Sequence, residues 1–289
     1  MLEISNDFLQ VRLSAQGAEL QSITRKDHQL EYLWSGDPAF WGKKSPILFP
    51  IVGGLKNNAY RYNGREYHLG RHGFARDMAF TVTLHTASSI NFSLQDNEST
   101  LQHYPFPFSL NVRYTVQDAT LLVNYEVQNM GDEVMYFSIG AHPAFRVPLV
   151  AGTRFEDYAL HFNETETAGV WPLSAGGQIA TTPLPCLEET RQLPLKKELF
   201  YKDALVFKHL ASTAIAIRSA QTAHGVEVHF PGFPYMGIWS AKDADFVCIE
   251  PWCGIADHVD ATGELQEKEG IMPLKPEEIF QKQWSAVFF

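Results

Sequence analysis

Short runs in which apolar and polar residues alternate recur along the whole chain. This pattern limits the fold more than any other feature of the sequence. A period of two residues is typical of a β-strand with one buried and one exposed face. The runs that predict strands lie at residues 8–13, 79–84, 90–94, 110–116, 121–127, 135–139, 158–162, 214–218, 226–230, 235–239, 246–249 and 279–288.

The segments between these runs favour turns over helices. Asn63-Gly64 predicts a two-residue hairpin turn, because both residues accept the positive φ of a type I′ turn. Helix signals are confined to 37–40, where an N-cap precedes a proline, and to 98–104, which is expected to form a turn or two. Gly53-Gly54 is interpreted as a turn, since no phosphate-binding GxGxxG or GxxxxGK[ST] loop is present. The sequence therefore predicts an all-β protein, a large antiparallel sandwich or barrel with few short helices.

Bulk composition limits the domain count and the class of ligand. The chain has 289 residues, 45% of them hydrophobic, which is enough apolar material for one large core. No linker or change in composition divides it, so we expect a single domain over residues 1–289. The net charge of −10 argues against nucleic-acid binding, which depends on basic patches. A local cluster of Lys and Arg is still compatible with a small anionic ligand.

Cysteines and the N-terminus bear on the cellular compartment. Cys186, Cys248 and Cys253 are too few and too scattered for a disulfide framework, and CxxxxC spacing suggests neither a zinc knuckle nor a redox pair. The first residues lack the layout of a signal peptide, and no stretch approaches the length of a membrane span. We therefore expect a cytoplasmic protein without a membrane partner. The sequence gives no indication of its oligomeric state.

Three short segments place a titratable side chain among glycine, proline and aromatic residues. They are residues 70–76 (GRHGFAR), 139–145 (IGAHPAF) and 248–254 (CIEPWCG), which contain His72, His142 and Glu250. Two imidazoles and a carboxylate suit general acid–base catalysis near neutral pH, because His titrates there and a partly buried Glu can be tuned towards it.

The surroundings of His142 and Glu250 favour a functional role for both. Pro143 is expected to end the preceding strand and so to project His142 out of the sheet. Glu250 follows the apolar run 246–249, so we expect it to be desolvated, with a raised pKa that suits a base near pH 7. The alternative for Glu250 is a structural carboxylate that binds strand-end amides or an arginine.

His72 lies between Arg71 and Arg76. A cleft that binds a polyhydroxylated or anionic ligand tolerates such cations near a histidine better than a core does. A purely structural histidine is the alternative. A metal site with two His and one carboxylate is a further possibility, but the chain has no HxH pair of the kind that such β-sandwich metal enzymes usually use.

Beyond these residues, the chain resembles the aldose 1-epimerase (galactose mutarotase-like) family, and within it the branch of LacX-type proteins. The similarity runs nearly from end to end. It rests on segments at 13–20 (LSAQGAEL), 46–53 (PILFPIVG), 72–76 (HGFAR), 140–145 (GAHPAF), 233–240 (FPYMGIWS) and 249–252 (IEPW).

The resemblance implies a β-supersandwich whose concave face binds a sugar, and mutarotation without a cofactor or metal. Glu250 is then expected to take the proton from the C1 hydroxyl while His142 donates one to the ring oxygen, with His72 bonded near the same oxygen. Trp239, Trp252 and Phe74 are expected to supply apolar faces for the sugar ring.

Two positions depart from the family pattern. Gly54 stands where well-studied members have a sugar-binding Arg, and no Asp stands near 229–231, where the galactose enzymes have one. We expect Arg71 to bind the sugar hydroxyls that a glycine at position 54 cannot reach, with Arg76 as a second substrate-binding residue. The alternative is a pocket for a sugar phosphate made by Arg71 with Lys43 or Lys44.

Three functions follow from these observations. The first is a 1-epimerase that acts on a hexose or on a hexose 6-phosphate. The second is a sugar-binding or regulatory protein with the same fold and no useful turnover. The third is a metal-dependent β-sandwich enzyme.

Overall fold

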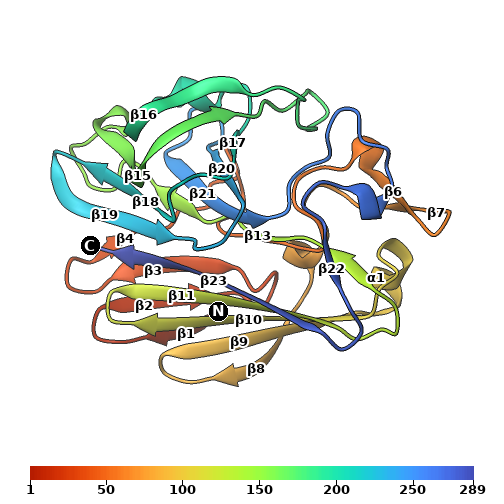
Figure 1. Ribbon diagram of the computed structural model, residues 1–289. Coiled ribbons are helices and arrows are strands. Elements are labelled where there is room, and N and C mark those ends of the chain that lie inside the picture. The colour runs from red at the N-terminus through yellow and green to blue at the C-terminus, as the bar shows by residue number, and fades with distance from the viewer.

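The alternating runs form antiparallel strands, which the computed structural model describes over residues 1–289, and the predicted all-β sandwich is confirmed. The longest sheet has nine strands. Their bounds are β8 (Thr81–His85), β9 (Ser89–Gln95), β10 (Phe108–Gln117), β11 (Thr120–Asn129), β15 (Tyr158–Val170), β16 (Leu184–Pro194), β18 (Ala214–Ser219), β19 (Thr222–His229) and β23 (Ile279–Phe288). Their order is β16-β15-β18-β19-β23-β11-β10-β9-β8, which Figure 1 shows from top to bottom on the left.

A second sheet of six strands faces the first. Its members are β5 (Ile47–Leu48), β13 (Ile139–Ala141), β17 (Leu205–Lys208), β20 (Tyr235–Trp239) and β21 (Phe246–Cys253), with β14 (Ala144–Arg146) paired to β21. The order β17-β20-β21-β13-β5 places β21 at the centre, between β20 on one side and β13 with β14 on the other.

The remaining strands form small sheets at the periphery. They are β1 (Leu2–Ser5), β2 (Leu9–Leu13), β3 (Leu20–Arg25) and β4 (Leu30–Glu31) in one sheet, β6 (Ala59–Tyr62) with β7 (Arg65–His68), and β12 (Met135–Phe137) with β22 (Met272–Leu274). Asn63 and Gly64 have positive φ between β6 and β7, as the predicted hairpin turn requires.

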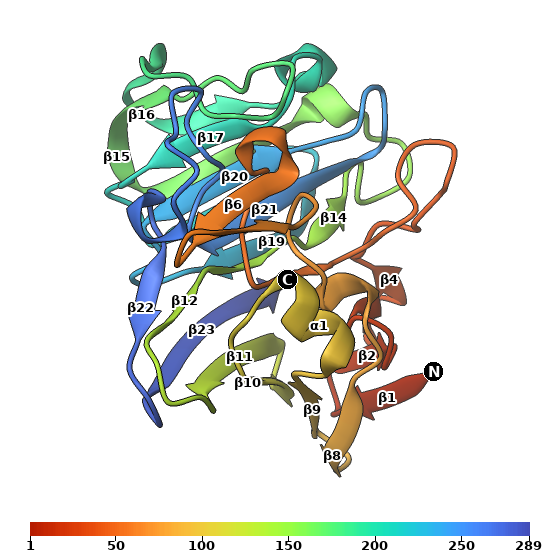
Figure 2. The same ribbon diagram turned by 90° about the vertical axis from the view of Figure 1, so that its right-hand side faces the viewer.

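Helices are short. They are α1 (Glu98–His103) and the 3₁₀ turns η1 (Lys56–Asn58), η2 (Ala75–Asp77), η3 (Phe155–Asp157), η4 (Lys197–Phe200) and η5 (Leu265–Glu267). The Asn97 side chain caps α1, which confirms the turn or two expected at 98–104. No helix has the length and hydropathy of a membrane span. Figure 2 shows α1 below β6 on the side of the molecule that carries β12 and β22.

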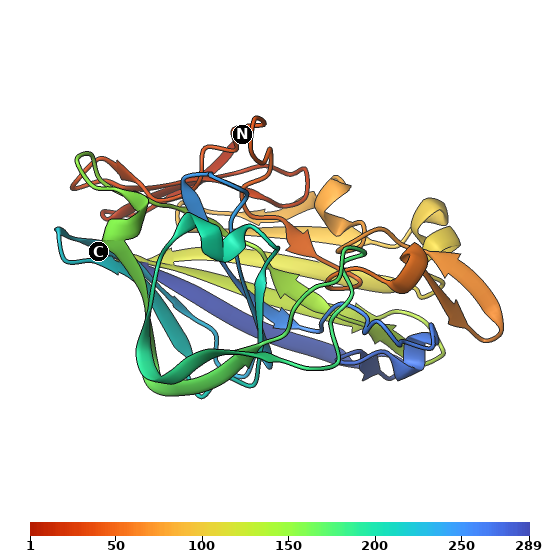
Figure 3. The same cartoon turned by 90° about the horizontal axis from the view of Figure 1, so that it is seen from above.

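The main core lies between the two large sheets. One face of β10, which includes Leu110 and Val112, is fully buried in this core. Arg113, on the opposite face of the strand, is exposed. Val247 and Ile249 of β21 join the same core from the other side. The opposite face of β21 is therefore free to line a site. Figure 3 shows the segment between β15 and β17, green to teal, looping over the upper side of the molecule.

Three local predictions are corrected. The segment 37–40 forms a single turn, in which the Asp37 side chain accepts from the Ala39 N–H, and no helix follows. The predicted strand 135–139 is two strands, β12 and β13, which break at Ser138 because they belong to different sheets. The strand predicted to end at Ile249 continues through Pro251 to Cys253.

Candidate active site

A cavity of about 560 Å³ lies on the face of β21 that is turned away from the main core. The alternation along this strand selects the side chains that reach it. Val247 and Ile249 pack into the core, whereas Glu250 and Trp252 line the cavity. Glu250 is only 1% exposed. The strand thus holds a buried carboxylate in a cavity that polar and apolar side chains line together.

His142 lies opposite Glu250 because of the strand register. On either side of it, Gly140 in β13 opposes Trp252 and Ala144 in β14 opposes Cys248, which places His142 level with Glu250. The two strands break between these pairs, at His142-Pro143, and the imidazole is turned into the cavity. Its Nε2 atom lies 3.2 Å from Glu250 Oε2.

His72 reaches the same cavity from the loop that follows β7. Its backbone has a φ of +68°, and its N–H donates to the Gly53 carbonyl oxygen at 2.8 Å. Its Nδ1 accepts from the Gly53 N–H at 3.1 Å, so the ring carries its proton on Nε2. Its ring centroid is 5.7 Å from that of His142. The Nε2–H group is therefore the donor that His72 offers to a ligand.

Two glycines make room for the Trp252 ring. A Cβ on Gly140 would lie 2.6 Å from Trp252 Cδ1, and a Cβ on Gly237 would lie 2.4 Å from its Cη2. These glycines belong to the strands on either side of β21. They allow the indole to lie across its neighbours and form part of the cavity wall beside Glu250.

Several polar atoms at this site are buried without a hydrogen-bond partner in the protein. They are His142 Nδ1, Glu250 Oε2 and Trp252 Nε1. Although Glu250 Oε2 lies near His142 Nε2, the pair does not have hydrogen-bond geometry. Buried polar atoms are rarely left unpaired, because each one costs free energy. Their concentration here indicates a site that a polar ligand completes.

Burial shifts the acid–base properties of all three candidate residues. Burial, followed by the negative charge of Asp203, raises the pKa of Glu250 well above its usual range. Burial also lowers the pKa of His142 to about 3. The pKa of His72 is lowered by burial, then by the nearby His142, Arg76 and Arg71. Desolvation thus makes Glu250 a stronger base and protonated His142 a stronger acid.

Aromatic rings pack around His142. The Trp41 ring stacks on the imidazole at a centroid distance of 4.9 Å, and the Trp239 ring meets it edge-on at 5.6 Å. Both rings line the cavity with Trp252. Sequence reasoning singled out Trp239 and Trp252 but not Trp41, which follows the 37–40 turn and belongs to no recognised motif.

Of the other predicted substrate-binding residues, Arg71 and Arg76 line the cavity and Phe74 does not. The Phe74 ring contacts the buried rings of Phe49 and Phe108, so it stabilises the loop rather than forming a surface for a sugar. Arg76 donates to the Arg71 carbonyl oxygen at 2.9 Å.

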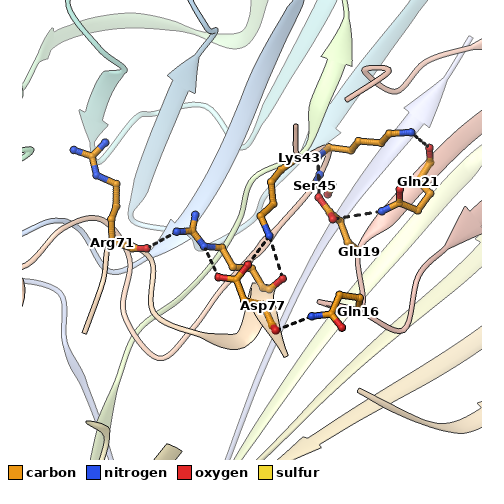
Figure 4. Close-up of polar contacts among 9 residues, drawn as sticks. Gln16, Glu19, Gln21, Lys43, Ser45, Arg71 and Asp77 are labelled. Carbon is orange, nitrogen blue, oxygen red and sulfur yellow. Dashed lines mark hydrogen bonds and ion pairs between the residues drawn. The ribbon is translucent and has the colours of Figure 1, made fainter. Parts of the chain in front are cut away.

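The two lysines considered for a phosphate pocket are engaged elsewhere. Lys43 Nζ pairs with Asp77 Oδ1 at 2.6 Å, and Lys44 Nζ donates to the Gln21 carbonyl oxygen at 2.8 Å. Neither lines the cavity. Figure 4 shows Lys43 directed at Asp77, and the Arg71 guanidinium directed away from this group of side chains.

Three further segments line the cavity and were missed by sequence reasoning. They contribute Leu173, Gly177 and Ile179 between β15 and β16, residues 200–204 at the end of η4 and beyond it, and residues 240–242 between β20 and β21. Lys197 Nζ links the last two segments by pairing with Asp245 Oδ1 at 2.6 Å. None of the three contains a recognisable motif, and only the position of Asp203 in space brings it to the site.

A metal-capable cluster overlaps the site. The ligand atoms of His142, Cys248 and Glu250 all lie within 4.8 Å of one another. Cys248 shares the cavity-facing side of β21 with Glu250 and packs beneath it against Phe246 and Ala144. All three cysteines are free thiols.

Comparisons with known proteins agree on one family. The family described as Aldose 1-epimerase matches residues 1–272. Protein LacX, chromosomal, of Lactococcus lactis subsp. lactis is 35% identical, over 98% of this chain and 97% of that protein.

Solved structures agree with this assignment. A galactose mutarotase related enzyme from Lactobacillus acidophilus has a TM-score of 0.94 and 38% identity, over 99% of this chain and 96% of that chain. A galactose mutarotase-like protein from Lactobacillus casei ATCC 334 has a TM-score of 0.92 and 30% identity, over the full length of both chains.

Proposed function

Because the chain belongs to the aldose 1-epimerase family, we propose that it interconverts the α and β anomers of a hexose through the open-chain aldehyde. The observation that supports this most is the opposition of His142 and Glu250 across neighbouring strands, 3.2 Å apart in a cavity of sugar size. The C1 hydroxyl and the ring oxygen are bonded to the same carbon. A base and an acid that act on them together must therefore lie close to one another.

In the proposed reaction Glu250 takes the proton from the C1 hydroxyl, and His142 donates a proton to the ring oxygen as its bond to C1 breaks. The pair begins as carboxylate and imidazolium and ends as carboxylic acid and neutral imidazole. Rotation about the C1–C2 bond presents the other face of the aldehyde. Ring closure then reverses both proton transfers and restores the starting pair.

The buried setting supports this assignment of roles. The raised pKa of Glu250 and the lowered pKa of His142 both favour the state that follows ring opening, in which Glu250 is a carboxylic acid and His142 a neutral imidazole. The short Nε2–Oε2 separation offsets this by stabilising the charged pair before reaction. Burial and charge attraction therefore act in opposite directions on the free-energy difference between the two states of the pair.

His72 and the aromatic rings bind the sugar in this scheme. The Gly53 N–H donates to His72 Nδ1, so the Nε2–H of His72 is free to donate a hydrogen bond to the sugar near its ring oxygen. Burial keeps this histidine neutral at physiological pH by lowering its pKa. Trp252, Trp239 and Trp41 offer apolar surface to the C–H faces of the ring.

Polarimetry tests the proposal directly. Freshly dissolved α-glucose or α-galactose loses optical rotation slowly by itself, and the protein is expected to accelerate this decay in proportion to its concentration. A non-catalytic sugar-binding protein gives the spontaneous rate, even at sugar concentrations where binding is measured by NMR. That result would contradict the proposed function.

A further inference from the structure

We propose that Arg71 and Asp203 together bind two neighbouring hydroxyl groups of an uncharged hexose and so determine which sugar the cavity accepts. The inference rests on the proposed function, because it names the substrate class of the same site. Arg71 comes from the loop after β7, and Asp203 from the loop before β17. Their side chains face each other within the cavity, with Arg71 Nη1 3.8 Å from Asp203 Oδ2.

Two glycines shape the space that the Arg71 guanidinium occupies. A Cβ on Gly177 would lie 2.0 Å from Arg71 Nη2, so any larger residue there displaces the side chain. A Cβ on Gly54 would lie 4.0 Å from Arg71 Nε. The guanidinium thus lies beside residue 54, where a Cβ would make an ordinary contact, and it is Gly177 that leaves the room for it.

Asp203 is held in an unusual backbone conformation. Its φ is +136°, a value that residues with a Cβ rarely adopt. Its Oδ1 accepts from the Ala204 N–H at 2.8 Å, which fixes the carboxylate and leaves Oδ2 directed towards Arg71. Strained residues of this kind are concentrated at ligand-binding sites, where the surrounding structure holds them in place. We therefore assign Asp203 to binding rather than to loop structure.

The gap between the two side chains suits a diol. A separation of 3.8 Å is too long for a hydrogen bond, so the facing atoms of both groups keep their capacity for a ligand. The planar fork of Arg71 can donate to two adjacent hydroxyl oxygens, and Asp203 Oδ2 can accept the proton of one of them. A sugar that lacks either hydroxyl leaves one of these groups unsatisfied.

At the Arg71 guanidinium, the neighbouring Asp203 carboxylate favours an uncharged ligand. Arg76, Lys202 and Lys242 also line the cavity, but Asp203 Oδ2 lies 3.8 Å from Arg71 Nη1 and so weakens the attraction of this guanidinium for a phosphate. Asp203 therefore distinguishes uncharged hexoses from hexose 6-phosphates, because its carboxylate attracts the hydroxyl donor of a sugar and repels a phosphate anion.

The test compares the wild type with Arg71→Ala, Asp203→Asn and the double variant. The probes are glucose, galactose, their 6-phosphates, and deoxy analogues of glucose that lack the hydroxyl at C2, C3, C4 or C6. Ligand-observed NMR gives Kd, and exchange spectroscopy gives kcat/KM for anomer exchange. Arg218→Ala and Glu227→Gln are matched controls, because this pair lies outside the cavity and its side chains are 47% and 31% exposed, against 46% and 30% for Arg71 and Asp203.

Two of the deoxy analogues, which lack one or the other of two neighbouring hydroxyls, are expected to bind the wild type about 10- to 100-fold more weakly than glucose. This is the loss in affinity when a hydrogen bond to a charged group is removed. The same two deletions are expected to cost almost nothing further in the Arg71 and Asp203 variants. The control variants should behave as the wild type, and Asp203→Asn should weaken glucose binding.

Variants within twofold of the wild type for every sugar would overturn the inference. So would a preference for 6-phosphates of more than about tenfold that Asp203→Asn strengthens. If the binding pattern holds without anomer exchange, the inference stands and the proposed function fails. If exchange occurs without the pattern, only the inference fails. A wild type that binds none of these sugars contradicts both.

Discussion

His142 and Glu250 oppose each other across β13–β14 and β21, with Nε2 and Oε2 3.2 Å apart, although 107 residues of chain separate them. The register that pairs Gly140 with Trp252 and Ala144 with Cys248 places the two side chains level. The proposed acid and base are thus positioned by the centre of a sheet. A site built on rigid strands is held more tightly than one built on loops.

The first prediction concerns Gly237, which leaves room for the Trp252 ring. Gly237→Ala places a methyl group 2.4 Å from the ring carbon Cη2 and must displace the indole. Overpacking of this kind costs about 1–3 kcal/mol of stability. We expect a lower melting temperature and a loss of anomer exchange. Gly70→Ala is the control, because nothing lies within 4 Å of a Cβ there, and it should match the wild type. Full activity in Gly237→Ala would show that the Trp252 position does not matter.

The second prediction concerns stability and pH. Burial raises the pKa of Glu250 above its usual value of 4.5, so between these two values the folded protein binds more protons than the unfolded chain. The free energy of unfolding therefore falls as pH rises through this window. Gln cannot ionise, so Glu250→Gln should be more thermostable than the wild type at pH 8, and this advantage should shrink towards pH 4.5. Thermal denaturation across this range measures it, and a constant difference in melting temperature would contradict the raised pKa.

A third prediction separates proton transfer from metal chemistry. Because the proposed reaction only moves protons between the sugar and two side chains, dialysis against EDTA should leave kcat/KM within about twofold of its starting value. The nearby donor set of His142, Cys248 and Glu250 makes the test informative, since nitrogen, sulfur and oxygen ligands together suit zinc. A metal enzyme would be favoured if EDTA abolished the activity, Zn²⁺ restored it in the wild type, and Zn²⁺ failed to restore it in Cys248→Ser.

Much of the fold follows from local patterning. Predicted strands at 235–239 and 279–288 have the bounds of β20 and β23, because each has one face in the core. Patterning predicts only the start of the β15–β16 hairpin, since β16 is an edge strand that is exposed along most of its length and shows no alternation. Local sequence carries no signal for such a strand.

The candidate site was predictable where a motif carries a titratable residue. His72, His142 and Glu250 stand among glycine, proline and aromatic residues, and the structure brings all three to one cavity. Trp41 and Asp203 reach the cavity through tertiary packing of loops, and nothing in their neighbouring residues indicates this. Phe74 shows the converse, since its motif lies at the site while its ring packs in the core.

The exchange rate of saturating hexose in Glu250→Gln and His142→Asn tests the central claim most directly, with folding checked by circular dichroism and sugar binding by NMR. Each variant should lose about two to four orders of magnitude in kcat, as removal of a general acid or base typically does, and should still bind sugar. His229→Asn and His258→Asn are the controls, because neither residue lines the cavity, and both should keep the wild-type rate. A folded Glu250→Gln or His142→Asn protein whose kcat lies within a few-fold of the wild type would contradict the account.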